Sequence, residues 1–231
     1  MLRHLPNIFT ALNMVSGCLG LLSIYKGDLF MGALFILIGA IFDFLDGFIA
    51  RLLDAKSELG KQLDSLADLV TFGMVPAFLL YFLLEGKGSA YISMVSLLVV
   101  ISSAIRLARF NIDESQRVSF KGLPTPASAF LVAGLVFAHE GNWQIFSFLY
   151  NNVTGLIIFI IAITILLNTP LTFLSFKIRS YELKGNEYIF LLILLSLVCF
   201  FLYGFKGILP VTLIYMVLSI LKTLFFKNES S

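Results

Sequence analysis

Residues 29–50 read LFMGALFILIGAIFDFLDGFIA, and this stretch decides the fold. It is long enough to cross the hydrocarbon core of a bilayer as a helix, for which about 20 apolar residues suffice. A lone strand could not cross, because its backbone N–H and C=O groups would lack partners in hydrocarbon. The stretch also carries Asp43 and Asp46. A carboxylate in a membrane helix is costly and usually serves a function, so this helix is expected to carry part of a site.

The whole chain has the same apolar character. Its 231 residues are 59% hydrophobic and 13% charged, and the mean hydropathy is +0.97. About a quarter of the residues in a soluble domain are charged, so this composition excludes a soluble globular protein as well as a disordered or collagen-like chain. The net charge of +2 gives no reason to expect a nucleic-acid partner. The sequence therefore predicts an integral membrane protein.

Further apolar runs on both sides of this stretch predict an all-α, polytopic transmembrane helical bundle of about eight spans, with seven or nine as alternatives. The polar segments between these runs are too short to hold a core of their own. We therefore expect residues 1–231 to form a single integral membrane domain. The spans are expected near residues 8–25, 29–50, 63–84, 89–110, 124–139, 145–167, 187–204 and 208–226.

The basic residues predict the orientation of the bundle. If the chain crosses eight times, both termini lie on the same side of the membrane. Of the 16 Lys and Arg residues, all but Lys26, Lys87 and Lys206 then lie on that side. Loops rich in Lys and Arg stay in the cytoplasm, so both termini are expected to be cytoplasmic.

Four aspartates near the cytoplasmic ends of the second and third spans are the candidate site. Asp43 and Asp46 are three residues apart and Asp64 and Asp68 are four apart, so each pair projects from one face of its helix. The two helices are consecutive and antiparallel, which lets the faces meet. Four carboxylates in one pocket need counter-charge. Oxygen ligands suit Mg²⁺, Mn²⁺ or Ca²⁺, and two such ions would form a phosphoryl-transfer site.

Small residues and one arginine accompany the aspartates. Gly47, Ala50 and Gly60 would let a bulky ligand lie against the helix backbone. Arg51 could hold phosphate oxygens with its two-pronged guanidinium group. An ordinary charge at the membrane surface is the alternative for Arg51.

Together these residues resemble the signature of the CDP-alcohol phosphotransferase family. The resemblance implies that an alcohol hydroxyl attacks the phosphorus of a CDP-linked substrate and displaces CMP. It also implies that the four aspartates hold two divalent metal ions, Mg²⁺ or Mn²⁺, and that Asp68 is the catalytic base as well as a ligand. A homodimer is a further expectation from the family. The matching pattern is Asp43-x-x-Asp46-Gly47-x-x-Ala50-Arg51, eight residues, then Gly60-x-x-x-Asp64-x-x-x-Asp68.

Three other stretches resemble the serine branch of this family, the membrane-bound bacterial phosphatidylserine synthases. This branch implies that CDP-diacylglycerol is the donor, that L-serine is the acceptor, and that the protein works with membrane lipid in a bacterial cytoplasmic membrane, with its active site on the cytoplasmic side. The stretches are LPNIFT at 5–10 with Asn13 and Gly17 after it, IRLARFN at 105–111, and FKGLPTPA at 120–127.

The flanking stretches add candidate ligand contacts. Asn7 and Thr10 are expected to contact the CDP group together with Gly47, Ala50, Arg51 and Gly60, although capping of the first helix is an alternative for Asn7 and Thr10. Serine carries a carboxylate that needs a cation. The candidates for this cation are Arg106, Arg109 and Lys121, which could instead hold lipid headgroups or anchor the helices.

Two rival interpretations remain open at this point. Within the same family, the acceptor could be glycerol phosphate or inositol phosphate, or the donor could be an archaeal ether lipid. Outside it, intramembrane acids could form the pathway of a divalent-cation transporter. A transporter predicts acids throughout the membrane thickness, whereas here they gather at one end of two spans.

Overall fold

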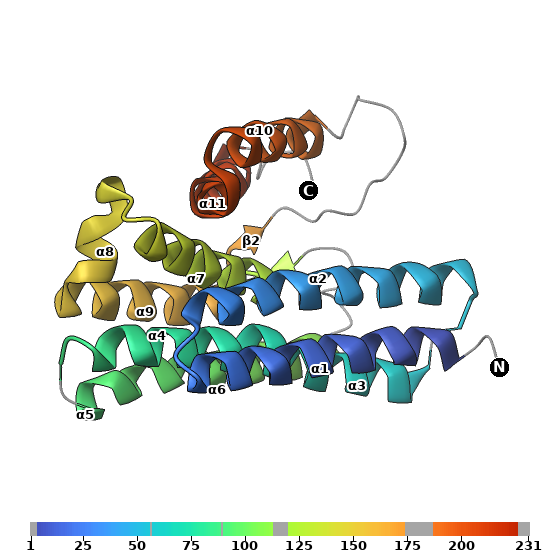
Figure 1. Cartoon of the computed structure of the whole chain (residues 1–231). Coiled ribbons are helices and arrows are strands. Elements are labelled where there is room, and N and C mark those ends of the chain that lie inside the picture. The colour runs from blue at the N-terminus through green and yellow to red at the C-terminus, as the bar shows by residue number, and fades with distance from the viewer. Residues whose placement is uncertain (1–3, 56, 89, 113–119, 174–186, 226–231) are drawn as a thin grey trace.

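A computed structural model describes residues 4–55, 57–88, 90–112, 120–173 and 187–225 of the chain. Nearly all of these residues are helical, which confirms the predicted all-α class. Figure 1 shows α1 and α2 running side by side in opposite directions, with the N-terminus and the α2–α3 loop at one end of the bundle. We call this end the N-terminal end, and the end with the α1–α2 and α4–α5 turns the opposite end.

The elements follow one another along the chain with short connections. The first half contains α1 (Leu5–Tyr25), α2 (Leu29–Leu52), α3 (Glu58–Asp68), the π-helical segment η2 (Leu69–Met74), α4 (Val75–Glu85), α5 (Ala90–Ser93), η3 (Met94–Leu97) and α6 (Leu98–Ile112). The second half contains β1 (Phe120–Lys121), α7 (Thr125–Glu140), η5 (Gln144–Phe146), α8 (Ser147–Asn151), α9 (Val153–Leu167), β2 (Thr172–Phe173), α10 (Glu187–Tyr203), η6 (Gly204–Gly207) and α11 (Ile208–Phe225).

Local side chains begin the two helices that carry the aspartates. Asp28 caps α2, because its Oδ1 accepts a hydrogen bond of 2.9 Å from the Met31 N–H. Ser57 caps α3 in the same way, accepting from the Gly60 N–H at 3.0 Å. Such caps satisfy backbone donors that the first turn of a helix leaves unpaired. They fix where the two helices start, and hence where their aspartates lie along the axis.

Helix α7 is the centre of the bundle. Most of its residues are buried, from Thr125 to Ala138, and it packs against α2, α4 and α11. Its start is tied to the end of α9 by a short antiparallel pairing of β1 with β2. Gly122 makes the turn between β1 and α7 with φ +81°, and a Cβ there would collide with the Leu167 carbonyl oxygen. The close approach explains why glycine stands at this position.

The predicted count of eight spans is not confirmed. Among the described residues, five helices are long and apolar enough to cross a membrane, or six if the helices over 144–151 and 153–167, bent by 87°, count as one span. Helix α7 coincides with the fifth predicted span but has only 16 residues. The last two predicted spans coincide with α10 and α11. There, Gly204 at φ +58° turns the chain back, so that a Cβ on Gly207 would lie 2.6 Å from the Cys199 carbonyl oxygen.

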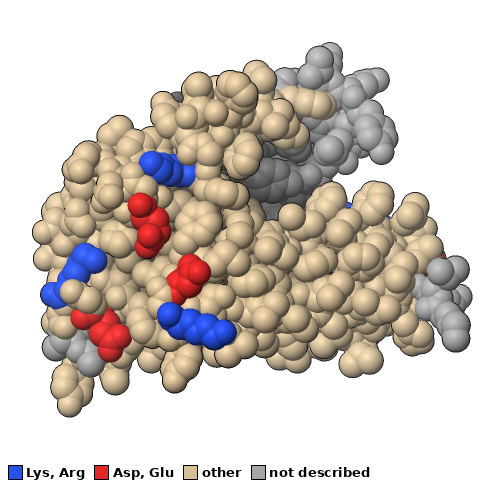
Figure 2. Space-filling view, in the orientation of Figure 1, with Lys and Arg blue, Asp and Glu red and all other residues tan. Residues whose placement is uncertain are grey.

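One face of the molecule is uncharged over most of its length. Figure 2 shows a wide uncharged face, with Lys, Arg, Asp and Glu gathered towards the opposite end. Large apolar side chains such as Val15, Ile41 and Phe44 are exposed on α1 and α2. Water would make that exposure costly, whereas lipid does not. The several apolar helices with these exposed side chains indicate an integral membrane protein.

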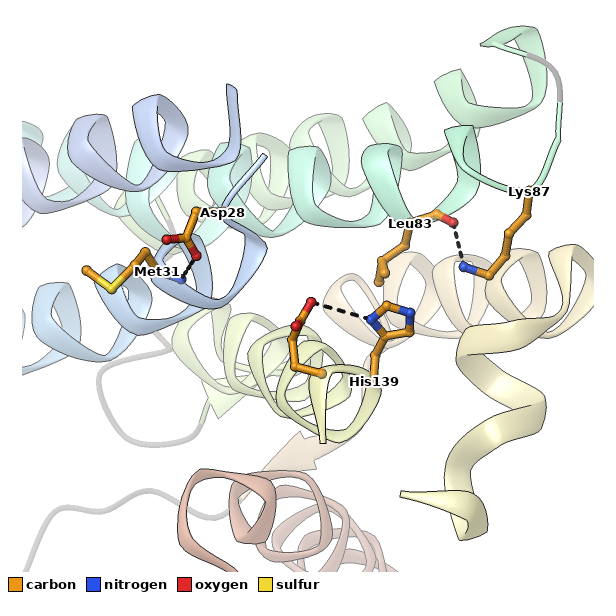
Figure 3. A network of polar contacts seen from close by, with 6 residues as sticks. Asp28, Met31, Leu83, Lys87 and His139 are labelled. Atoms are coloured by element: carbon orange, nitrogen blue, oxygen red, sulfur yellow. Dashed lines mark hydrogen bonds and ion pairs between the residues drawn. The ribbon is translucent and has the colours of Figure 1, made fainter. Parts of the chain in front are cut away.

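Polar contacts close the opposite end of the bundle. Figure 3 shows Asp28 at the start of α2, with Lys87 donating to the Leu83 carbonyl oxygen at 3.2 Å. His139 Nδ1 at the end of α7 lies 3.7 Å from Glu140 Oε1. Each of these contacts joins residues within a few positions of each other in the sequence. They finish helix ends and do not form a site shared between distant helices.

Candidate active site

Three carboxylates from two helices meet inside the N-terminal half of the bundle. Asp43 comes from α2, and Asp64 and Asp68 come from α3. Each offers one oxygen, and these oxygens lie within 4.8 Å of one another. Helix α1 packs against both α2 and α3 and so covers the junction. The predicted meeting of the two helix faces is therefore present in the structure.

The fourth aspartate lies beside this trio and has its own partner. Asp46 is buried, and its Oδ2 accepts a hydrogen bond of 2.7 Å from Thr10 Oγ1. Its charge also interacts with Asp64. The Pro6 carbonyl oxygen lies 3.1 Å from the same hydroxyl and shares its single proton with Asp46. The structure thus places Thr10 against a carboxylate from the next helix.

The cluster fits a divalent metal ion. Asp64 Oδ1 is buried and has no hydrogen-bond partner among the residues described by the structure. A buried carboxylate oxygen without a donor is costly, and three carboxylates so close together repel one another. A cation bound between them would relieve both problems. Carboxylate oxygens are the ligands that Mg²⁺ and Mn²⁺ prefer.

The remaining nucleotide-contact candidates line the N-terminal end of this cluster. Arg51 is exposed in the last turn of α2, and its Nη1 lies 3.7 Å from the position of a Cβ on Gly47. A Cβ on Gly60 would lie 3.1 Å from Asn7 Oδ1, so the absent side chain lets α1 approach α3. Ala50 is half-buried on α2. Helix α1 begins after His4 without a side-chain cap, so the capping alternative for Asn7 and Thr10 is wrong.

The three serine-contact candidates have different positions. Arg106 of α6 is buried, with 8% of its surface exposed, and its charge interacts with Asp68 and Tyr215. Its Nη1 donates to Thr125 Oγ1 at 3.4 Å, while its Nε lacks a partner within the described part of the chain. Arg109 is exposed. Lys121 belongs to β1, but its side chain lies outside the described residues.

A polar link between α3 and α6 escaped the sequence analysis. Asn111 Nδ2 donates to Ser65 Oγ at 2.8 Å, and Lys61 Nζ donates to the Asn111 carbonyl oxygen at 2.8 Å. These contacts hold the helix with Asp64 and Asp68 against the helix with Arg106. In the sequence, the residue that could have indicated this link is Asn111, the last residue of the stretch 105–111 that resembles the serine branch.

The geometry agrees with what sequence comparison finds. A family model described as CDP-alcohol phosphatidyltransferase matches residues 3–225. The chain belongs to this family. The match covers the aspartates, Arg106 and the last helices alike, so it confirms the resemblance that the motif indicated and extends it over nearly the whole chain.

Named relatives within this family include serine enzymes. A Helicobacter pylori protein named CDP-diacylglycerol–serine O-phosphatidyltransferase is 34% identical over 98% of this chain and 96% of its own length. A Bacillus subtilis protein of the same name is 34% identical over 60% of this chain and 78% of its own. An archaetidylserine synthase of Methanothermobacter thermautotrophicus is 35% identical over 56% of each chain.

The Thr10–Asp46 hydrogen bond leads to the first prediction. Replacing Thr10 by valine keeps the shape of the side chain but leaves Asp46 Oδ2 without its donor. Partners that orient metal-binding carboxylates contribute about 10–100-fold to activity or metal affinity. We therefore expect Thr10→Val to lower the rate of CMP release by about that factor. Thr10→Ser keeps the hydroxyl and should stay near the wild-type rate; equal losses in both variants would mean that packing alone is at work.

Proposed function

We propose that this protein is a CDP-diacylglycerol–serine O-phosphatidyltransferase, which transfers the phosphatidyl group from CDP-diacylglycerol to L-serine and releases CMP. The observation that carries the proposal is the buried guanidinium group of Arg106 near the aspartate cluster, where its charge acts on Asp68. The two together supply an acidic site for metal ions and, next to it, a cation for an acceptor. The relatives named as serine enzymes, one of them aligned over 98% of this chain, support the same activity.

The aspartates would hold two divalent ions, Mg²⁺ or Mn²⁺, with Asp43, Asp46, Asp64 and Asp68 as ligands. When bound, such ions polarise the pyrophosphate of the donor and stabilise the charge that develops on CMP. Asp68 acts as base and takes the proton from the serine hydroxyl. The serine oxygen then forms a bond to the phosphorus of the phosphatidyl group, and the bond from that phosphorus to CMP breaks. CMP leaves with the electron pair of that bond.

The residues at the N-terminal end would hold the CDP group. Arg51 is exposed and free to turn towards phosphate oxygens, which it can bind with two parallel hydrogen bonds. Gly47 and Ala50 present little or no side chain on α2, and Gly60 lets Asn7 of α1 lie close to the start of α3. Thr10 lies next to Asp46, and with these residues it completes the proposed contacts of the CDP group.

The acceptor assignment favours serine over a phosphorylated alcohol. Arg106 is the one buried basic side chain in the described parts of the sequence. One guanidinium group matches the single negative charge of the serine carboxylate, whereas glycerol phosphate or inositol phosphate brings a phosphate of higher charge. Arg109 is exposed and suits a lipid headgroup or the membrane surface better. The exposure of Arg109 and burial of Arg106 thus support Arg106 as the serine contact.

The membrane orientation and assembly belong to the same proposal. We place the protein in a bacterial cytoplasmic membrane as a single domain over residues 1–231, with both termini and the active site on the cytoplasmic side. The count of Lys and Arg along the sequence supports this side, because 13 of the 16 lie in the segments expected on the side of both termini, and such residues are retained in the cytoplasm. A homodimer is proposed from the family alone. The four aspartates Asp43, Asp46, Asp64 and Asp68 gather at one level of α2 and α3, which is unfavourable for a transport pathway across the membrane.

The test is CMP release by the detergent-purified protein with CDP-diacylglycerol and a panel of alcohols. We expect release that requires both L-serine and Mg²⁺ or Mn²⁺, stops with EDTA and resumes when the metal is restored. Release with glycerol phosphate or inositol phosphate in place of serine would overturn the acceptor. A parallel reaction with a CDP-linked ether lipid distinguishes the donor, since a strong preference for it would favour an archaetidylserine-type activity.

A further inference from the structure

Asn13 is a buried polar residue in the apolar helix α1, and its side chain reaches the proposed base. It is 0% exposed, and its Nδ2 donates a hydrogen bond of 3.4 Å to Asp68 Oδ1. A carboxamide inside a membrane helix is costly unless it is hydrogen-bonded to a partner. The amide must present its nitrogen to Asp68, because its oxygen would repel a carboxylate. Asn13 thus constrains one oxygen of Asp68.

Thr71 holds the backbone of Asn13 in place. Its Oγ1 donates to the Asn13 carbonyl oxygen at 2.9 Å, and the side chain is 0% exposed. Thr71 lies in η2, the π-helical segment that follows Asp68 directly. Short π-helical segments within a longer helix often occur at functional sites. Helix α1 is therefore joined to the segment around Asp68 at two points, by the side chain and by the backbone of one residue.

Two glycines make room for this junction. A Cβ on Gly17 of α1 would lie 2.6 Å from Thr71 Oγ1. A Cβ on Gly39 of α2 would collide with Thr71 Cγ2 and lie 2.9 Å from Asn13 Oδ1. Neither Thr71 nor Asn13 can turn far within such a gap, since interiors are close-packed. The junction therefore gives the Asn13 side chain one orientation.

We propose that Asn13 is a positioning residue for Asp68. Thr71 and the close approach at Gly17 and Gly39 fix the orientation of the Asn13 side chain. That side chain in turn holds the Asp68 carboxylate, so that one of its oxygens stays within reach of Asp43 and Asp64. The proposal rests on the proposed function, in which Asp68 is a metal ligand and the base. In this role Asn13 acts through Asp68 and not as a catalytic residue or metal ligand itself. Its effect is to keep Asp68 in one rotamer whether or not the ligands are bound.

The test measures metal binding as well as turnover. Mn²⁺ is titrated into the detergent-purified protein, and the free ion is followed by electron paramagnetic resonance. We expect Asn13→Ala to weaken Mn²⁺ binding and to lower kcat, each by about 10–100-fold, with little change in the KM for CDP-diacylglycerol. Thr71→Val removes the hydroxyl but keeps the shape, and it should change both quantities in the same direction. Thr71→Ser keeps the hydroxyl and should bind Mn²⁺ nearly as the wild type does.

Asp68→Asn in the same titration separates this inference from the function on which it rests. Unchanged Mn²⁺ binding by Asp68→Asn would refute Asp68 as a metal ligand and with it the proposed site. Weakened binding by Asp68→Asn, with Asn13→Ala and Thr71→Val at the wild-type value, would overturn the positioning role alone. Equal losses in Thr71→Val and Thr71→Ser would also overturn it, because packing would then be responsible. If Asn13→Ala does not fold, the two Thr71 variants decide.

Discussion

Asp68→Asn should lose nearly all turnover while the helical bundle stays folded. The substitution keeps the size of the side chain but removes both its negative charge and its ability to take a proton. A positioned general base contributes about 10²–10⁴-fold to a rate, so we expect kcat for CMP release to fall by at least this factor. The loss should not come from unfolding, because the repulsion of Asp43 and Asp64 by Asp68 falls once residue 68 is neutral.

The matched control for this variant is Asp54→Asn. Asp54 lies in the exposed loop between α2 and α3, between the two aspartate pairs, and has φ +47°. Asparagine tolerates this left-handed conformation well, so the control carries the same chemical change without strain. Circular dichroism during heating checks that both variants fold. If Asp68→Asn keeps a rate comparable to that of Asp54→Asn, Asp68 is neither the base nor an essential ligand.

Arg106→Ala should raise the KM for serine far more than the KM for CDP-diacylglycerol. A hydrogen bond to a charged group contributes about 1.5–3 kcal/mol, which corresponds to about 10–150-fold in KM. Arg106 lies in the interior near Asp68. The proposed contacts of the CDP group are instead Arg51 and the small residues of α2 and α3. Loss of Arg106 should therefore affect serine binding more than donor binding. The measurement is the initial rate at varied concentrations of each substrate.

Arg109→Ala is the control for Arg106→Ala. The two arginines are three residues apart on α6, but Arg109 is exposed and Arg106 is buried. We expect Arg109→Ala to leave the KM for serine close to its wild-type value. Arg106→Lys keeps a positive charge without the two-pronged geometry and should recover part of the loss. An equal rise in both KM values for Arg106→Ala would indicate a packing role instead.

Much of the site could be predicted because it depends on local spacing. The intervals between Asp43 and Asp46 and between Asp64 and Asp68 place each pair on one helix face, whatever the rest of the chain does. The short connection between α2 and α3 then brings these faces together. For the same reason each of the eight apolar runs coincides with helical residues in the structure. The number of complete membrane spans, however, does not follow from hydropathy. Bends and chain reversals, such as that at Gly204, depend on backbone geometry.

Asn13 and Thr71 could not be recognised in the same way. Both are polar residues in apolar helices. Their presence there indicates that placing them in the membrane is costly, but it does not indicate which residues they contact. Their partners are distant in the sequence: Asn13 contacts Asp68, and Thr71 contacts the backbone of Asn13. The space for them comes from Gly17 and Gly39 on two other helices. Only packing of α1 against α2 and η2 creates that arrangement.

By itself, then, the sequence determined the properties that arise within one helix or between consecutive helices. These are the apolar length that requires helices in a membrane, the carboxylate pairs and the family to which the chain belongs. The tertiary structure decided which residues from distant segments lie at the candidate site. It buried Arg106 and exposed Arg109, and it set Asn13 against Asp68. The physical reason is that spacing determines the face of a helix, whereas burial and hydrogen-bond partners depend on what packs against that face.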